Sequence, residues 1–196
     1  MAEFRRPSMP GPGHFEAVAE DNDPAELAAA GQRIAHLLVR GPLDRADGEQ
    51  IDRILHLADT EGLGSIAALW SHAAADSLAG ALWRLYVLRT WVHREPSQAA
   101  REFASGRSYA PVHEVLAGVV EPPGPAEVIT LVDTVVRGIV VTDLDVVLDR
   151  AAAFAHIVGV GRGQLDDSDA ASAARLVDMA HHLRLAAALE RSGELH

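Results

Sequence analysis

Residues 23–42 read DPAELAAAGQRIAHLLVRGP, and this stretch carries the signals for both ends of a helix. Asp23 suits the N-cap position, and Pro24 suits the first helical position because its missing N–H would have no partner there. Gly41 followed by Pro42 ends the pattern. Between these ends, apolar residues recur at helical spacing: Leu27, Ala30, Ile34, Leu37 and Leu38. The segment therefore predicts an amphipathic helix.

Similar patterns along the chain predict an all-α fold, a compact bundle of about seven to nine helices. Further helices are expected over residues 44–61, 65–74, 76–94, 96–104, 125–139 and 142–158, and a last one that starts at the acidic run 166–169 and continues to about residue 191. The segment 125–139 is rich in β-branched residues, so a strand pair is the alternative there. Glycines at 159, 161 and 163 predict the end of one helix and a turn. A phosphate-binding loop is not expected, because acidic residues follow these glycines.

The predicted organisation is a flexible arm over residues 1–22 and a single all-α domain over residues 23–196. A Pro/Gly-rich linker at 108–124 would divide that domain into halves at 23–107 and 125–196. The sequence PAEL at 24–27 returns as PAEV at 125–128, which suggests an internal duplication. The alternative is that two unrelated helices share the same favourable start.

The composition excludes several kinds of chemistry. The chain has 196 residues, a formal net charge of −11 and no cysteine, and its 17 Lys and Arg residues are all arginine. The absence of cysteine removes disulfide scaffolds and thiol nucleophiles, and the absence of lysine removes Schiff-base and P-loop chemistry. The acidic charge argues against a nucleic-acid coat. The lysine-free, alanine-rich composition is typical of a high-GC genome.

We expect a cytoplasmic protein without a membrane partner. The N-terminal residues contain arginines but no apolar core of a signal peptide. No apolar run reaches the length of about 18 residues that a membrane span needs. No cofactor is predicted.

Aromatic residues and arginines concentrate in one stretch of this acidic chain. All three tryptophans and both tyrosines lie between residues 70 and 109, and between residues 83 and 109 five arginines accompany only two glutamates. In the helix expected at 76–94, Trp83 and Tyr86 fall nearly opposite the leucine-rich face. A helix that is apolar on two faces is either central to the core or a contact surface. The candidate interface residues are Trp83, Arg84, Tyr86, Arg89, Trp91 and Arg94.

Arg89 falls at the edge of the leucine-rich face. If it is buried, it needs a carboxylate or several carbonyl groups, because an unpaired buried charge is costly. The expectations are a structural ion pair or an anion site.

Three His/Asp pairs at i, i+4 are the metal candidates, because this spacing places two ligands on one helix face. The pairs are His56 with Asp52, His72 with Asp76, and His182 with Asp178. The alternative interpretation is ordinary surface pairs, since the Glu-x-x-His motif of helical di-metal sites is absent.

The leading hypothesis is a non-enzymatic interaction or regulatory protein that contacts a protein partner, or a second copy of itself as a homodimer, through the aromatic and arginine-rich helical region. A metal-dependent or small-molecule-binding helical enzyme that uses the His/Asp pairs is the alternative. Nucleic-acid binding through the basic stretch at 83–109 is a weaker alternative, because the net charge opposes it.

Overall fold

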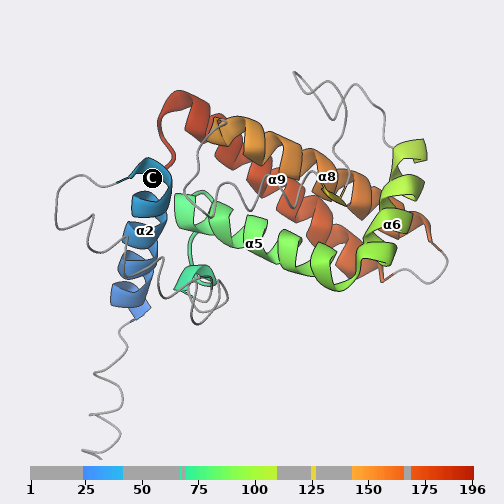
Figure 1. The fold of residues 1–196 in the computed structure, drawn as a ribbon, viewed down its shortest axis with the longest axis horizontal. Helices are drawn as coiled ribbons and strands as arrows, with labels where there is room; N and C mark the ends of the chain where they lie inside the picture. Colours follow the sequence, from blue (N-terminus) through green and yellow to red (C-terminus); the bar gives the residue numbers. More distant parts are fainter. Residues whose placement is uncertain (1–23, 42–66, 68, 110–124, 127–142, 166–168) are drawn as a thin grey trace, which may run out of the picture.

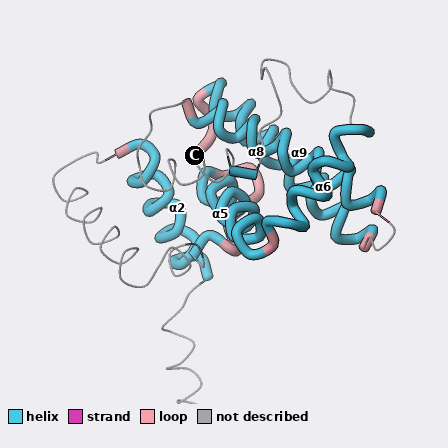
Figure 2. Tube along the Cα trace, turned by 45° about the vertical axis from the view of Figure 1, so that its right-hand side comes forward, coloured by secondary structure: helices cyan, strands magenta, loops and turns pink. Residues whose placement is uncertain are grey.

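The computed structural model describes residues 24–41, 67, 69–109, 125–126, 143–165 and 169–196. In these residues the regular secondary structure is entirely helical, which confirms the all-α prediction for this part of the chain (Figure 2). The elements are α2 (Pro24–Arg40), α5 (Leu78–Arg94), α6 (Pro96–Tyr109), α8 (Leu144–Gln164) and α9 (Ala170–Ser192). The helix predicted at 44–61 and nearly all of that at 125–139 lie outside the described residues. The helix count and the internal duplication therefore stay predictions.

Helices α5, α8 and α9 lie side by side, with α6 crossing one end of this group and α2 standing at the other (Figure 1). Residues 165–169 connect α8 to α9, and α9 runs back along α8 as an antiparallel hairpin. The hairpin forms the most extensive helix–helix contact in the described residues, and the contact between α6 and α8 is next. Helix α8 is therefore the central element.

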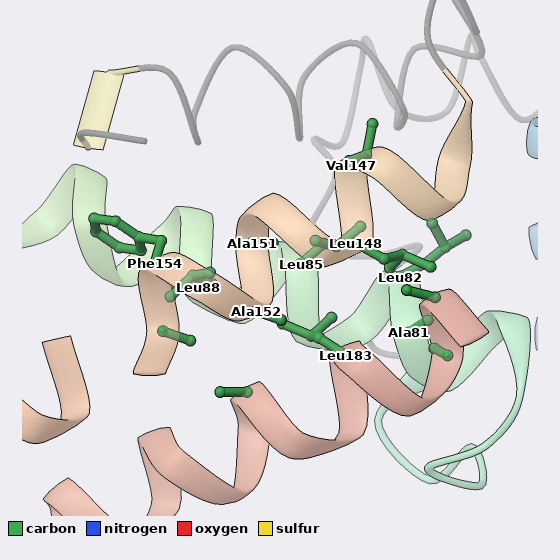
Figure 3. Packing of buried hydrophobic residues seen from close by; sticks show 14 of the residues in the cluster. Ala81, Leu82, Leu85, Leu88, Val147, Leu148, Ala151, Ala152, Phe154 and Leu183 are labelled. Carbon is green, nitrogen blue, oxygen red and sulfur yellow. The ribbon is translucent and has the colours of Figure 1, made fainter. Parts of the chain in front are cut away.

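The core explains why α8 is central. From Leu144 to Gly161 most of its side chains are buried, on all sides of the helix. Leu148 and Phe154 are fully buried. Leu148 lies beside Leu85 of α5, and Leu183 of α9 lies beside Ala152 (Figure 3). The Phe154 ring stacks on that of Phe103 in α6, with the centroids 5.5 Å apart. A helix that is apolar around its whole circumference is stable only when neighbours cover every face.

The glycines at 159, 161 and 163 do not end this helix, contrary to the prediction. Helix α8 continues to Gln164, and its glycines provide space for neighbours. A Cβ atom on Gly161 would lie 1.8 Å from the carbonyl oxygen of Glu102 in α6, and one on Gly106 would lie 1.8 Å from that of Ile157 in α8. The two backbones approach too closely for any side chain, so tertiary packing outweighs the low helix propensity of glycine.

Helix α6 was also predicted too short. It continues through Gly106 to Tyr109, into the first residues of the expected linker. At the other boundary, the segment expected to be helical up to Ala74 turns after Trp70, and Ser77 caps α5 by accepting a hydrogen bond from the Gly80 N–H at 3.1 Å. These differences are shifts in the ends of helices that were correctly expected.

Helix α2 is the element whose C-terminal end was predicted best. It ends at Arg40, and Gly41 takes the left-handed conformation with φ of 78° that a helix terminus favours. The Trp70 indole donates a hydrogen bond to the Gly31 carbonyl at 2.9 Å, which attaches α2 to the segment before α5. Beside α2, the Leu78 N–H donates to the backbone oxygen of His196 at 2.8 Å, so the last residues complete the start of α5.

Candidate functional site

Helix α5 carries the candidate interface residues, and its two faces differ as the sequence predicted. The leucine-rich face, which includes Leu82, Leu85 and Leu88, is buried against α8 and α9. On the opposite side Trp83, Tyr86 and Val87 are half-buried. The second face is thus less covered than the first and retains aromatic surface.

Trp83 and Tyr86 form a stacked pair on that second face. Their ring centroids lie 5.9 Å apart with an interplanar angle of 25°. Val87, Thr90 and Arg94 continue the same side of the helix at i+4, i+7 and i+11 from Trp83. We call Trp83, Tyr86, Val87, Thr90 and Arg94 the outer surface of α5. Stacking fixes the aromatic side chains before any contact forms, which lowers the entropy that binding must remove.

Arg84 lies at the edge of this outer surface. Its Nη1 donates a hydrogen bond to the Gly80 carbonyl of the preceding turn at 2.7 Å. Partial burial lowers the pKa of the Arg84 guanidinium, because the charged form loses hydration. Among the residues that the structure describes, no carboxylate lies within ion-pair distance of this guanidinium. Arg84 therefore retains hydrogen-bond donors for a further acceptor.

The other arginines of α5 differ from Arg84. Arg94 is exposed at the end of the helix. Arg89 is half-buried and already interacts with a neighbouring group, and the expectation of an ion pair or an anion site there stays a prediction. The remaining candidate, Trp91, is half-buried with the guanidinium of Arg162 over its ring, 5.0 Å from the centroid. Trp91 is thus part of an internal contact.

That internal contact belongs to a buried charged network that the sequence analysis did not predict. Arg162 of α8 donates from Nε and Nη2 to the two carboxylate oxygens of Glu102 in α6, each at 2.9 Å. Its Nη1 donates to Ser172 Oγ in α9 at 2.6 Å, and Gln98 Nε2 donates to Glu102 Oε1 at 2.8 Å. Arg162 therefore joins three helices and covers an aromatic ring on α5.

A sequence signal for this network existed. Glu102 shares one stripe of α6 with Ala99, Phe103 and Gly106, all of which are buried. A carboxylate on an apolar stripe requires a buried cationic partner, because an unpaired buried charge costs several kcal/mol. The sequence pattern did not identify Arg162 as this partner, because it lies between Gly161 and Gly163 in a run that predicted a turn outside the core.

The structure does not assemble the metal candidates. His72 and Asp76 are exposed in the turns before α5, and the His72 ring nitrogen Nδ1 lies 2.9 Å from Ser71 Oγ. Asp178 is exposed and His182 is half-buried on α9. Within the described ranges no three His, Asp or Glu side chains gather as ligands. Asp52 and His56 lie outside the described residues.

One open pocket of about 300 Å³ lies between the ends of α2, α8 and α9. Its walls are Val39, Arg40, Asp143, Leu144, Asp145, Glu190 and Arg191. Arg40 pairs with Glu190, and Arg191 pairs with Asp149 at 2.6 Å. The hydrogen bonds that the two guanidinium groups donate to these carboxylates raise the pKa of both arginines. Both guanidinium groups already bind carboxylates of this chain. The ion pair between Arg40 and Glu190 therefore attaches α2 to α9, and the pocket offers no unpaired arginine for a ligand.

Only some of the arginines in the basic stretch at 83–109 are exposed to solvent. Arg94, Arg101 and Arg107 are exposed, as is Tyr109 at 61%. Arg107 lies over the Phe103 ring at 5.9 Å, and Glu102 is neutralised by Arg162. The exposed charge on α5 and α6 is therefore mostly positive, against the net negative charge of the chain.

No family model, curated protein or solved structure matches this chain. In the described residues, no helix has both the length and the apolar character needed to cross a bilayer.

Proposed function

We propose that this chain is a non-enzymatic interaction protein and that the outer surface of α5 contacts a protein partner. The observation that carries the proposal is the half-buried Trp83–Tyr86 stack, beside Arg84, whose guanidinium has no carboxylate partner among the residues that the structure describes. Tryptophan, tyrosine and arginine are the residues most enriched among those that dominate binding energy at protein interfaces. Here they lie together on a helix whose other face is held by the core.

The rigidity of α5 supports this function. The buried residues of α5 between Leu82 and Val92 belong to the same core cluster as those of α8 between Val147 and Phe154, so α5 cannot shift without disturbing that core. A surface on a firmly packed helix presents its side chains in one arrangement, which favours specific contact.

Site-specific photo-crosslinking tests the proposal. A benzophenone amino acid placed at Thr90, in the middle of the outer surface, is expected to form one reproducible adduct in cells. The same group at His181, exposed on α9, is the matched control and is expected to form none. Trp83→Ala with Tyr86→Ala should lower the adduct yield by about tenfold or more, because hot-spot residues contribute about 2 kcal/mol or more each.

The variant must remain folded for this comparison, which circular dichroism and urea unfolding establish. An unchanged adduct yield in the folded double variant would contradict the proposal. If the adduct is a crosslinked dimer of the chain itself, and sedimentation shows a dimer that Trp83→Ala dissociates, the partner is a second copy and the surface is a homodimer interface.

We also propose a cytoplasmic location and a bundle of about seven to nine helices, as the helical pattern of the whole sequence suggests. The single domain over residues 23–196, the arm before it and the duplication of its halves are part of the same proposal. Limited proteolysis with a protease of broad specificity, followed by mass spectrometry, tests the boundaries: cleavage should concentrate before residue 23 and between residues 110 and 124.

A further inference from the structure

We infer that the outer surface of α5 binds an acidic, amphipathic segment of a partner protein. Its apolar side chains would lie against Trp83 and Tyr86, and one of its carboxylates would pair with Arg84. This inference rests on the proposed function and adds the chemistry of the partner.

The hydrogen bonding of Arg84 is the first argument. A guanidinium has N–H donors in a planar fork that matches the two oxygens of a carboxylate. One nitrogen of Arg84 bonds to the Gly80 carbonyl at 2.7 Å. By contrast, Arg162 places two nitrogens on Glu102, and Arg40 places two on Glu190. Among the described residues, the half-buried Arg84 therefore has no carboxylate partner, and a carboxylate from another protein would fit its remaining donors.

Charge complementarity is the second argument. Helix α5 carries three arginines and no carboxylate. Arg89 already interacts with a neighbouring group, and the exposed Arg94 is followed by the exposed Glu95. Arg84 is therefore a cation of α5 that has no carboxylate partner among the described residues. On the neighbouring α6, Arg101 and Arg107 are exposed, and the only buried carboxylate, that of Glu102, is paired with Arg162. The acidic groups elsewhere on the chain are screened beyond about 8–10 Å at physiological salt. A partner at this surface thus meets local positive charge.

The aromatic pair supplies the third argument, because it requires an apolar element in the same partner. Trp83 and Tyr86 are half-buried and pack against the core at their inner edges. An amphipathic partner helix presents an apolar residue on each turn with charged residues beside it, which matches a tryptophan–tyrosine stack flanked by arginines. A purely acidic segment would leave these rings in water.

Three synthetic peptides of about 18 residues, long enough to form a helix, test this chemistry. They share one leucine stripe, and the flanking positions are Glu in the first, Gln in the second and Lys in the third. Fluorescence anisotropy at about 0.1 M salt measures each affinity for the full chain. The Glu peptide should bind about tenfold more tightly than its Gln counterpart, as expected for a charge-assisted hydrogen bond, and the Lys peptide should bind most weakly.

Substitutions then assign the preference to one residue. Arg84→Gln should remove most of the difference between the Glu and Gln peptides, and Arg84→Glu should reverse the order of the Glu and Lys peptides. Arg184→Gln, which removes an exposed arginine from α9, is the matched control and should leave the order unchanged. Trp83→Ala should weaken all three peptides together.

Two results would overturn the inference. Equal affinities for the Glu and Gln peptides, together with sensitivity to Trp83→Ala, would show an apolar contact surface without acidic selectivity, and the proposed function would stand. Absence of binding by all three peptides would also overturn the inference, while the adduct at Thr90 would decide the proposed function separately.

Discussion

The Glu102 carboxylate has an exposed fraction of 2%, yet both of its oxygens accept hydrogen bonds from Arg162. Such a buried pair contributes little net stability, because the cost of removing both charges from water offsets much of their attraction. Losing one partner of the pair has a much larger effect on stability than losing both. Losing one partner leaves the other charge buried, with no water to solvate it.

The first prediction follows from that asymmetry. Arg162→Ala should lower the free energy of unfolding by about 3–5 kcal/mol, because Glu102 would remain buried without its cation. Urea unfolding measured by circular dichroism gives the value. The double variant Arg162→Met, Glu102→Met should recover most of the loss, since it removes both charges and fills the same space.

An exposed pair provides the control for this substitution. Arg175 lies 3.5 Å from Asp169, and both side chains are more than half exposed. Arg175→Ala should change the urea midpoint very little. A loss in Arg175→Ala equal to that in Arg162→Ala would show that burial is not the reason for the effect.

At the scale of elements, contact between α6 and α8 depends on two residues without side chains. A Cβ atom on Gly161 would meet the Glu102 carbonyl oxygen at 1.8 Å and the Gly106 nitrogen at 2.6 Å. These are backbone atoms, so no rotation of a side chain relieves the overlap. The two helices would have to separate.

Gly161→Ala should therefore destabilise the fold by about 1–3 kcal/mol or more, as overpacking of a tight core does. Gly163→Ala is the matched control, because a Cβ atom there meets only Ala173 Cβ at 3.8 Å. It should raise stability by about 0.5–1 kcal/mol through better helix propensity. Thermal unfolding compares the two variants, and equal shifts of the same sign would contradict the steric explanation.

The start of α5 depends on its N-cap. Ser77→Ala removes the acceptor for the Gly80 N–H and should cost about 0.5–2 kcal/mol. Asp143 occupies the same position at α8 but makes no side-chain capping bond, so Asp143→Ala should cost less. Urea unfolding of both variants checks this order, and a larger loss in Asp143→Ala would show that the cap geometry is not decisive.

Helix positions were predictable from the sequence wherever a local signal agreed with the packing. Gly41 ended α2, and the leucine spacing of α5 identified the face that is buried. The predicted helix ends were wrong near Gly106 and Gly161. At these positions glycine allows a neighbouring helix to pack closely, and its own helix continues. Local propensity contains no information about that neighbour.

At the scale of the whole molecule, the helices differ in how firmly they are held. Helix α8 is covered by α6 and α9 along its length, whereas α2 has several exposed residues and contacts α5 much less extensively. The attachments of α2 include the Trp70 indole on Gly31 and the ion pair of Arg40 with Glu190. Regions with few buried contacts open at lower free energy than the global unfolding value.

Amide hydrogen exchange should show this difference. Protection is expected to be strongest in α8 and clearly weaker in α2. Trp70→Ala should speed exchange in α2 while α8 changes much less, because the lost indole contacts Gly31 directly. Equal acceleration in both helices would contradict separate opening of α2 and indicate one cooperative unit.

The candidate interface was predictable only in part. The amphipathic pattern placed Trp83 and Tyr86 opposite the leucines of α5, and they are indeed less buried there. Trp91 had the same composition signal, but it lies under a guanidinium that comes from α8, far along the chain. Which aromatic residue is covered depends on contacts between distant segments, and these are not encoded in the spacing of one helix.

The crossing of α6 and α8 also has an evolutionary consequence. Because a Cβ atom at Gly106 or Gly161 would overlap a backbone carbonyl of the other helix, each position accepts only glycine while the helices keep their separation. A lineage that replaced one of them would need several compensating changes around the crossing at once. Among descendants of this chain, these two positions should therefore be among those that vary least.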